Sequence, residues 1–267
     1  MTEESPTKFA AIPDGLAQAD YVQSLAKGLA LLTAFGPAFP AMTSAEAANR
    51  IGVTRAAARR LLLTCEALGF VVRDGRQFRP APKVLDLARA FLSSVSWIDA
   101  ARGAMEALVN DLHETCSLLM LDGSDVVFVQ RVEAVTRLLT VNVRIGTRMP
   151  ALNTAGGRAI AAHLDSARRE DLLATGFTPM TEKAARDPEE LRAILETVRQ
   201  DGFAIIDGEM EQGLRSIAVP ILTPSGTPLG ALAMLIQASR VSVEDLHGTF
   251  GPRLKAAATT LSASAGS

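Results

Sequence analysis

The sequence predicts an α+β protein built from two domains that a helix joins. Its 267 residues exceed the length of one average domain and suit two. Residues 43–79 contain two capped helical patterns and a hairpin signal, whereas residues 116–267 alternate between strand and helix patterns. We therefore expect a disordered leader, an N-terminal domain, a linker helix and a C-terminal domain, over residues 1–20, 21–83, 84–115 and 116–267, respectively.

A winged helix-turn-helix is predicted between residues 43 and 79. Thr43 and Glu46 match a capping box, Thr-x-x-Glu, which predicts the start of a helix. Gly52 can adopt the positive φ that a sharp turn needs, and Thr54 can cap a second helix. Asp74-Gly75 is a strong signal for a β-hairpin. Helix, turn, helix and hairpin in this order are typical of a winged helix-turn-helix.

Positive charge is concentrated in the predicted N-terminal domain, although the whole chain has a net charge of -2. Residues 21–83 contain nine Lys or Arg and three Asp or Glu, a net charge of +6. Residues 84–267 contain 17 Lys or Arg and 22 Asp or Glu. A basic module on an acidic body is expected of a protein that binds DNA through one domain, although a basic surface can also serve solvation alone.

The second helix of the pair offers side chains for the major groove of DNA. Thr54 and Arg55 lie at its N-terminus, and Arg59 shares a face with Arg55 at a spacing of four residues. Arginines at these positions can bind guanine edges, whereas Arg60 and the hairpin arginines suit phosphates. The alternative is that they only keep the helix and the hairpin soluble. The predicted DNA contacts are Thr54, Arg55, Arg59, Arg60, Arg73, Arg76 and Arg79.

The C-terminal half mixes strand and helix patterns. Strands are predicted from apolar, β-branched runs, and helices from apolar residues at helical spacing. The expected strands are Ser117–Leu121, Val126–Val132, Leu138–Val143, Phe203–Ile206, Ser216–Leu222 and Leu229–Ile236. The expected helices are Ala155–His163, Arg168–Ala174, Pro188–Gln200 and Val243–Thr260.

The titratable residues form no recognisable catalytic or metal-binding pattern. His113, His163 and His247 are scattered, without the spacing of metal ligands. Cys65 and Cys116 lie far apart in apolar patterns, so they predict neither a disulfide framework nor a zinc site. We therefore expect no metal, no cofactor and no enzymatic activity.

Targeting and membrane signals are also lacking in the sequence. No apolar run approaches the roughly 20 residues that a transmembrane helix needs. The start, MTEESPTKFA, lacks the basic and apolar regions of a signal peptide. We expect a cytoplasmic protein without membrane contact.

Four segments, taken together, resemble the IclR family of bacterial transcriptional regulators. They are YVQSLAKGLALLTAF and GVTRAAARRLLLTCEALGFV in the first half, and RIGTRMPALNTAGGRAIAA and DGEMEQGLRSIAVPI in the second. YVQSL and TRAAARR are most similar to the branch that regulates aromatic-acid degradation through the β-ketoadipate pathway. The resemblance implies a GAF-like domain that binds a small organic or aromatic acid as effector. It also implies a homodimer or homotetramer on a palindromic operator in double-stranded DNA.

The same resemblance implies a ligand pocket formed by residues 149–157 and 207–216. Its expected ligand contacts are Asn153, Thr154, Arg215 and Ser216. Arg215 could pair with a ligand carboxylate, or it could hold a carboxylate of the protein, Asp207 or Glu211. Many members of the family have serines in the last strand, where this chain has Ala233, Met234 and Leu235, so its pocket should be more apolar or suit another acid.

The patterns and the resemblance together predict a ligand-responsive DNA-binding transcriptional regulator of aromatic-acid catabolism genes. The alternative is an enzyme or small-molecule carrier built on the C-terminal domain, with the N-terminal helices as a protein-interaction module. Sequence-specific DNA binding with a steep salt dependence would distinguish the regulator from this alternative.

Overall fold

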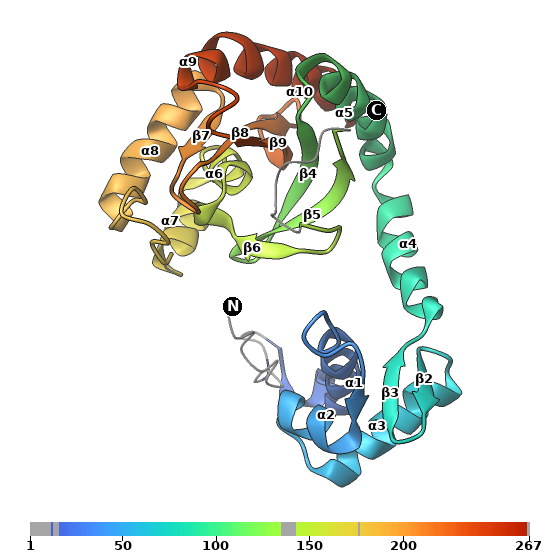
Figure 1. Cartoon of the computed structure of the whole chain (residues 1–267). Helices are drawn as coiled ribbons and strands as arrows, with labels where there is room; N and C mark the ends of the chain where they lie inside the picture. The colour runs from blue at the N-terminus through green and yellow to red at the C-terminus, as the bar shows by residue number, and fades with distance from the viewer. Residues whose placement is uncertain (1–11, 13–15, 135–142, 176, 266–267) are drawn as a thin grey trace. The chain divides into compact units, whose positions relative to one another are not determined.

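The computed structural model describes residues 12, 16–134, 143–175 and 177–265. The chain divides into two compact units, residues 1–94 and 95–267. The predicted α+β fold class is confirmed, because a helical unit with a small sheet precedes a unit built on a larger sheet (Figure 1). Most of the predicted leader lies outside the described residues, and Gln18–Asp20 within it forms a 3-10 turn. Of the strand expected at Leu138–Val143, all but the last residue lies outside them as well.

The N-terminal unit is a helix-turn-helix with a three-stranded antiparallel sheet, in which β3 lies between β1 and β2. Its helices are α1 (Gln23–Thr33), α2 (Ser44–Ile51), α3 (Arg55–Ala67) and α4 (Leu85–Ser94), and its strands are β1 (Met42–Thr43), β2 (Val71–Asp74) and β3 (Gln77–Pro80). Leu31, Ile51, Leu62 and Phe78 are among the buried residues of one core that holds α1, α2, α3 and the hairpin together.

Local contacts fix the end of α2 and the start of α3, as the sequence predicts. The backbone N–H of Thr43 donates to Glu46 Oε2 at 2.7 Å, and that of Glu46 donates to Thr43 Oγ1 at 3.3 Å, which completes the capping box. Gly52 ends α2 in the left-handed conformation, with φ 69°. Thr54 then caps α3, because its Oγ1 accepts from the backbone N–H of Ala57 at 3.2 Å.

The sequence predicts a long linker helix over residues 84–115 and allows a break near Ser93-Ser94, and the structure has two helices there. α4 ends at Ser94, and α5 (Ser96–Leu112) begins after Val95, whose backbone is not helical. The Ser94 hydroxyl donates to the carbonyl of Phe91 at 2.7 Å, a side-chain bond of the kind that competes with helix propagation. α4 belongs to the first compact unit and α5 to the second.

The C-terminal unit is built on a six-stranded antiparallel sheet in the order β6-β5-β4-β9-β8-β7. The strands are β4 (Thr115–Asp122), β5 (Asp125–Val132), β6 (Arg148–Pro150), β7 (Ala204–Asp207), β8 (Leu214–Leu222) and β9 (Pro228–Gln237). The helices after α5 are α6 (Ala155–Ala161), α7 (Ser166–Ala174), α8 (Pro188–Asp201), α9 (Val243–Asp245) and α10 (Gly251–Ala265), with a π-helical turn at Leu246–Phe250. α5 and α10 pack on one face of the sheet, and α6, backed by α8, covers the other (Figure 1).

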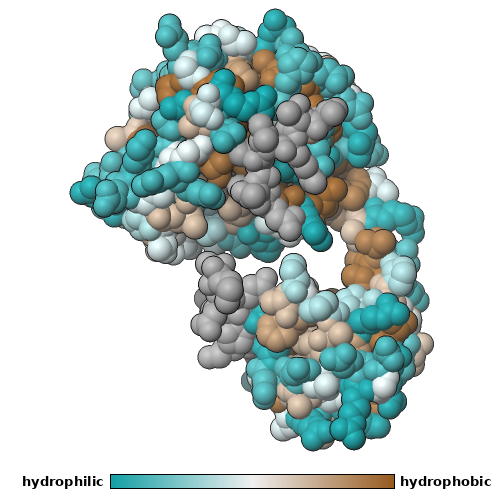
Figure 2. Space-filling model, in the orientation of Figure 1, coloured by the Kyte–Doolittle hydropathy of each residue, from teal (hydrophilic) through white to brown (hydrophobic). Residues whose placement is uncertain are grey.

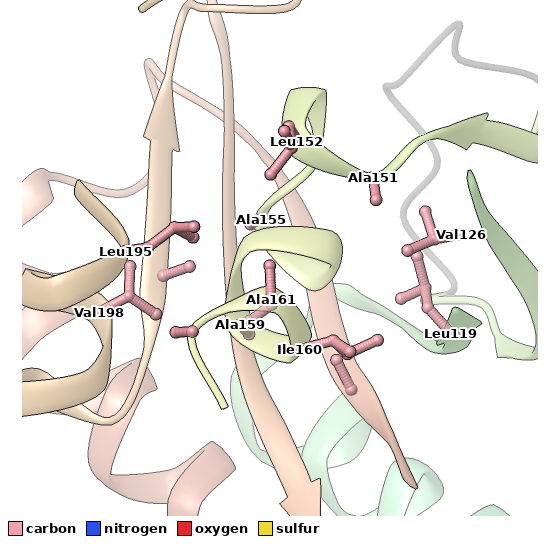
Figure 3. Packing of buried hydrophobic residues seen from close by; sticks show 14 of the residues in the cluster. Leu119, Val126, Ala151, Leu152, Ala155, Ala159, Ile160, Ala161, Leu195 and Val198 are labelled. Carbon is pink, nitrogen blue, oxygen red and sulfur yellow. The ribbon is translucent and has the colours of Figure 1, made fainter. Parts of the chain in front are cut away.

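Helix α6 lies close to the sheet because its residues are small. Figure 3 shows Ala155, Ala159 and Ala161 beside the larger side chains of the core that α6 shares with α8 and the sheet. Gly157 permits a close approach of α6 to the turn at Ala151–Asn153 that precedes it, since a Cβ atom there would lie 2.0 Å from the carbonyl oxygen of Ala151. This position therefore excludes every residue except glycine.

A buried ion pair ties α6 to the loop between β7 and β8. Arg158 has a side chain that is only 2% exposed, and its two terminal nitrogens donate to Glu209 Oε1 at 2.9 Å and Oε2 at 2.6 Å. Its Nε donates to the carbonyl of Leu152 at 2.9 Å. The hydroxyl of Thr181 holds the same loop through the carbonyls of Gly208, at 2.8 Å, and Glu209, at 3.1 Å. A guanidinium that is satisfied in this way fixes the position of the loop relative to α6.

Arg158→Met should destabilise the C-terminal unit by about 3–5 kcal/mol, because it leaves the carboxylate of Glu209 largely buried without its partner. Trp97, the single tryptophan of the chain, is buried in this unit and can report its unfolding by urea through fluorescence. The control is Arg192→Met, which removes an exposed ion pair with Glu170 and should leave the midpoint almost unchanged. Equal midpoints for the two variants would contradict a structural role for the buried pair.

Candidate nucleic-acid interface and ligand cavity

The first turns of α3 present cations to solvent. Arg55, Arg59 and Arg60 are all exposed, whereas Ala58 and Leu62 are fully buried in the core of the unit. α3 thus packs through Ala58 and Leu62 and leaves the arginines of its first turns in solvent. Arg60 belongs to a different side of α3 from Arg55 and Arg59, because it lines a hollow beside α1. This arrangement suits base contacts for Arg55 and Arg59 and a backbone contact for Arg60, roles that remain predictions.

The wing arginines point in different directions. The turn of the hairpin is formed by Gly75 and Arg76, one residue later than the Asp74-Gly75 pair that the sequence suggests, and Gly75 has φ 58°. Arg73 pairs across the hairpin with Phe78, and Arg79 pairs with Val72. Since neighbouring residues of a strand alternate between faces, Arg73 and Arg79 project from opposite faces of the wing. The two arginines therefore cannot contact DNA through the same face of the wing.

Arg73 is also engaged within the hairpin. Its Nε donates to the carbonyl of Gly75 at 3.1 Å, and its guanidinium carbon lies 5.8 Å from the centre of the Phe78 ring. Arg76, at the tip, is exposed. Of the three wing arginines, Arg76 is therefore best placed to reach a phosphate.

A cavity of about 240 Å³ lies between the sheet of the C-terminal unit and the start of α6. This volume is near the small end of ligand sites in proteins, roughly 300–1,000 Å³, and suits a ligand with one ring. Its wall is mostly apolar and includes Leu119, Phe128, Val143, Met149, Ile206, Ala233, Met234 and Leu235. Its polar members are Ser117, Arg131, Thr154, Glu211, Arg215 and Ser216.

Three of the four predicted ligand contacts line this cavity, and Asn153 does not. The amide nitrogen of Asn153 donates to the carbonyl of Thr178 at 2.8 Å, so it holds the chain beyond α7. Thr154 lines the cavity, but its hydroxyl already caps α6 at Gly157 and donates to the carbonyl of Ala151. Ser216 is half-buried in β8 and lines the cavity.

Arg215 holds a carboxylate of the protein, which was one of its two predicted roles. Its Nε and one terminal nitrogen donate to the two oxygens of Asp207, at 2.9 and 3.2 Å. Its other terminal nitrogen donates to the carbonyls of Ala238 and Val241, at 2.9 and 2.7 Å. The guanidinium thus links β8 to the end of β7 and to the chain that follows β9, and Asp207 balances its charge.

Sequence analysis misses Ser117 and Arg131, which face the cavity from neighbouring strands. The two residues pair across β4 and β5, and Arg131 donates to Ser117 Oγ at 3.2 Å. Strict alternation along β5 would put Arg131 on the face opposite to Phe128. A β-bulge changes this, because Phe128 pairs with Leu119 and Gln130 pairs with Leu118, which leaves Val129 as an extra residue.

The bulge determines which side chains of β5 face the cavity and which face α5. Phe128 and Arg131 both line the cavity. Gln130 points to α5 instead, where its amide, in the orientation that satisfies both of its polar atoms, donates to the carbonyl of Ile98 at 2.7 Å and accepts from Arg102 Nε at 3.2 Å. Bulges near binding sites commonly redirect a side chain in this way. A run such as Val126–Val132 carries no sequence signal for the bulge.

Reactive chemistry is not favoured at Cys116, the cysteine of the C-terminal unit. Burial raises the pKa of the Cys116 thiol to about 12, so the thiol stays protonated near neutral pH and is a poor nucleophile. His163 is held on α6 by a contact of 3.1 Å between Nδ1 and the carbonyl of Ala159, and burial lowers its pKa. Within the described ranges, His, Cys, Asp and Glu form no group of three that could hold a metal ion.

Across the part of the chain that the structure describes, no helix is long and apolar enough to cross a membrane.

Comparison with known proteins gives matches over almost the whole chain. Residues 24–75 match the IclR helix-turn-helix domain, and residues 89–263 match the C-terminal domain of bacterial IclR transcriptional regulators. The Pca regulon regulatory protein of Pseudomonas putida is 38% identical, over 91% of this chain and 84% of its own. The p-hydroxybenzoate hydroxylase transcriptional activator of Acinetobacter baylyi is 32% identical, over 91% of both chains.

Solved structures agree with this assignment. A transcriptional regulator from Rhodococcus sp. RHA1 has a TM-score of 0.80 at 39% identity, covering 91% of this chain and 98% of that one. An IclR homologue from Microbacterium hydrocarbonoxydans, solved with 4-hydroxybenzoate, has the same fold, with a TM-score of 0.79 at 22% identity, over 90% of this chain and 98% of that one. With its helix-turn-helix, its C-terminal sheet and these matches, the chain belongs to the IclR family of bacterial transcriptional regulators.

Proposed function

We propose that this protein controls genes for the breakdown of aromatic acids, and that a small aromatic acid changes its binding to an operator. The observation that carries the proposal is the presence, in one chain, of a cationic recognition helix in one unit and a small apolar cavity with an arginine in the other. The regulators of the Pca regulon and of p-hydroxybenzoate hydroxylase, as relatives, support an aromatic acid as the ligand. Binding to chromosomal DNA would place the protein in the cytoplasm.

On DNA, α3 would enter the major groove with its N-terminus first. Arg55 and Arg59 would then reach base edges, and the Thr54 hydroxyl would lie near the backbone at the helix start. Arg60 and Arg76 would bind phosphates on either side, and Arg79 would do so if its face of the wing meets DNA. Arg73 is the weakest candidate of the predicted set, since it is engaged with Gly75 and Phe78.

A second copy of the chain would cover the apolar surface of the N-terminal unit. α1, α3 and α4 line a hollow of about 730 Å³, and Leu25, Leu29, Leu68 and Leu87, which belong to its lining, are each about half exposed. Figure 2 shows hydrophobic surface at α4. Apolar patches of this kind on soluble proteins mark interaction sites. A homodimer formed here, or a homotetramer made from two such dimers, would supply the two recognition helices that a palindromic operator requires.

The cavity would bind its ligand without catalysis. Burial raises the pKa of the Cys116 thiol and makes it a poor nucleophile for an enzyme on this domain. This observation disfavours a cysteine enzyme on the C-terminal domain, whereas a small-molecule carrier would use the same cavity.

Arg55→Ala should reduce the preference for the operator over random DNA by about 1–3 kcal/mol, because a base contact is lost. Arg76→Ala should lower the affinity for both DNAs alike, because a phosphate contact is lost. It should also reduce the slope of log affinity against log salt concentration by about one. Fluorescence anisotropy at several salt concentrations measures both effects. The control is Arg89→Ala on α4, outside the predicted contacts. An unchanged preference in Arg55→Ala would refute the placement of α3.

Leu25→Glu should dissociate the dimer, because it would bury a carboxylate in an apolar interface. Sedimentation equilibrium of the full chain measures the effect. Ile145→Glu is the control, since Ile145 is also exposed but belongs to the C-terminal unit and does not line the hollow. A Leu25→Glu protein with the association constant of the unmodified chain would contradict the proposed interface.

Binding of 4-hydroxybenzoate should stabilise the C-terminal unit. At about 100 times its Kd, the ligand should add about 2.7 kcal/mol and raise Tm by roughly 5–10 °C. Operator affinity, measured by anisotropy with and without the acid, should change as well. Sodium chloride at equal ionic strength is the control. If neither 4-hydroxybenzoate nor protocatechuate moves Tm or operator affinity, the proposed ligand class is wrong.

A further inference from the structure

We infer that Arg131 binds the carboxylate of the ligand and makes the cavity selective for a monocarboxylate over its neutral analogue. The inference rests on the proposed function, since it concerns the same cavity. It gives the role of anion contact to a residue on β5, in place of the predicted Arg215 on β8.

The first argument is placement. Arg131 lines the cavity, and its side chain is 12% exposed, so its charge is largely withdrawn from water. The bulge at Val129 keeps it on the cavity face beside Phe128 and sends Gln130 to α5. A backbone irregularity at this position thus accompanies a cation on a mostly apolar wall. An interaction between opposite charges is stronger there than at the surface.

The second argument concerns two partners of the guanidinium. Arg131 donates to the neutral hydroxyl of Ser117 on β4, at 3.2 Å. Its ion pair with Glu133 is loose, with 3.5 Å between Nε and Oε1, and the Glu133 side chain is 43% exposed. A ligand carboxylate can replace this contact and keep the hydroxyl as an additional donor, because a guanidinium has five N–H groups and a hydroxyl can donate.

The contrast with Arg215 supports the choice. Both sides of the Arg215 guanidinium are engaged with fixed protein groups, namely both oxygens of Asp207 and two backbone carbonyls. A ligand that bound Arg215 would have to break these bonds at the ends of three strands. At Arg131 it would compete with the loose ion pair to Glu133, whose side chain is 43% exposed.

The rest of the wall limits the ligand to one negative charge and one ring. Phe128, Val143, Met149 and Leu235 offer apolar surface, and the volume of about 240 Å³ is small. Glu211 lines the cavity as well, and its carboxylate would repel a second acidic group. The chemical class that fits is a monocyclic monocarboxylate, with Ser216 available for a hydroxyl substituent.

Calorimetric titration of the full chain with 4-hydroxybenzoate and with 4-hydroxybenzamide tests this inference. The unmodified protein should bind the acid at least tenfold more tightly than the amide. Arg131→Met should lower the affinity for the acid by about 30-fold or more and the affinity for the amide by much less, so that the selectivity disappears. Arg131→Lys keeps the charge but loses the bidentate contact, and it should retain part of the selectivity.

Arg192→Met, on the exposed face of α8, is the matched control and should keep the selectivity of the unmodified protein. Equal affinity of the unmodified protein for acid and amide would overturn the inference, whatever the variants do, as would full selectivity in Arg131→Met. In both cases the proposed function would stand. Absence of acid binding to the unmodified protein would instead remove the proposed function itself.

Discussion

The buried ion pair between Arg158 and Glu209 is the contact on which the shape of the ligand cavity depends. It ties α6 to the β7–β8 loop, and that loop carries Met210 and Glu211 into the cavity wall. α6 is fixed in turn by the close approach of Gly157 to the carbonyl of Ala151. A buried pair need not add net stability to serve this purpose, because it selects one position of the loop among several apolar packings. The apolar cavity is therefore shaped by a polar contact outside its own lining.

The N-terminal unit was predictable because contacts between residues close in sequence determine its geometry. The capping box of Thr43 and Glu46, the left-handed Gly52 and the cap at Thr54 each involve residues at most four positions apart. Such signals act in the same way in any fold, so the helix-turn-helix follows from them. The strands of the C-terminal unit were also found, except for the short β6, whose three residues are too few for a pattern.

The candidate site was less predictable, because its residues are placed by partners far along the chain. Arg215 could be assigned to a ligand or to Asp207 by sequence, and the pairing of β7 with β8 decides for Asp207. The opposite faces of Arg73 and Arg79 follow from the register of the hairpin, which the position of its turn sets. Arg131 was missed because regular alternation along β5 would place its side chain on the face of the sheet that packs against α5. The bulge that reverses this appears only when β4 and β5 are paired.

The extra residue in β5 also gives the strand a tolerance for changes in length. Without Val129, regular alternation would still place Phe128 and Arg131 on the cavity face and Gln130 on the side of α5. During evolution, β5 can thus gain or lose one residue at this point while the set of ligand-facing side chains stays the same. An alignment of relatives should therefore be allowed a gap at residue 129 before it is used to ask which of them share the arginine.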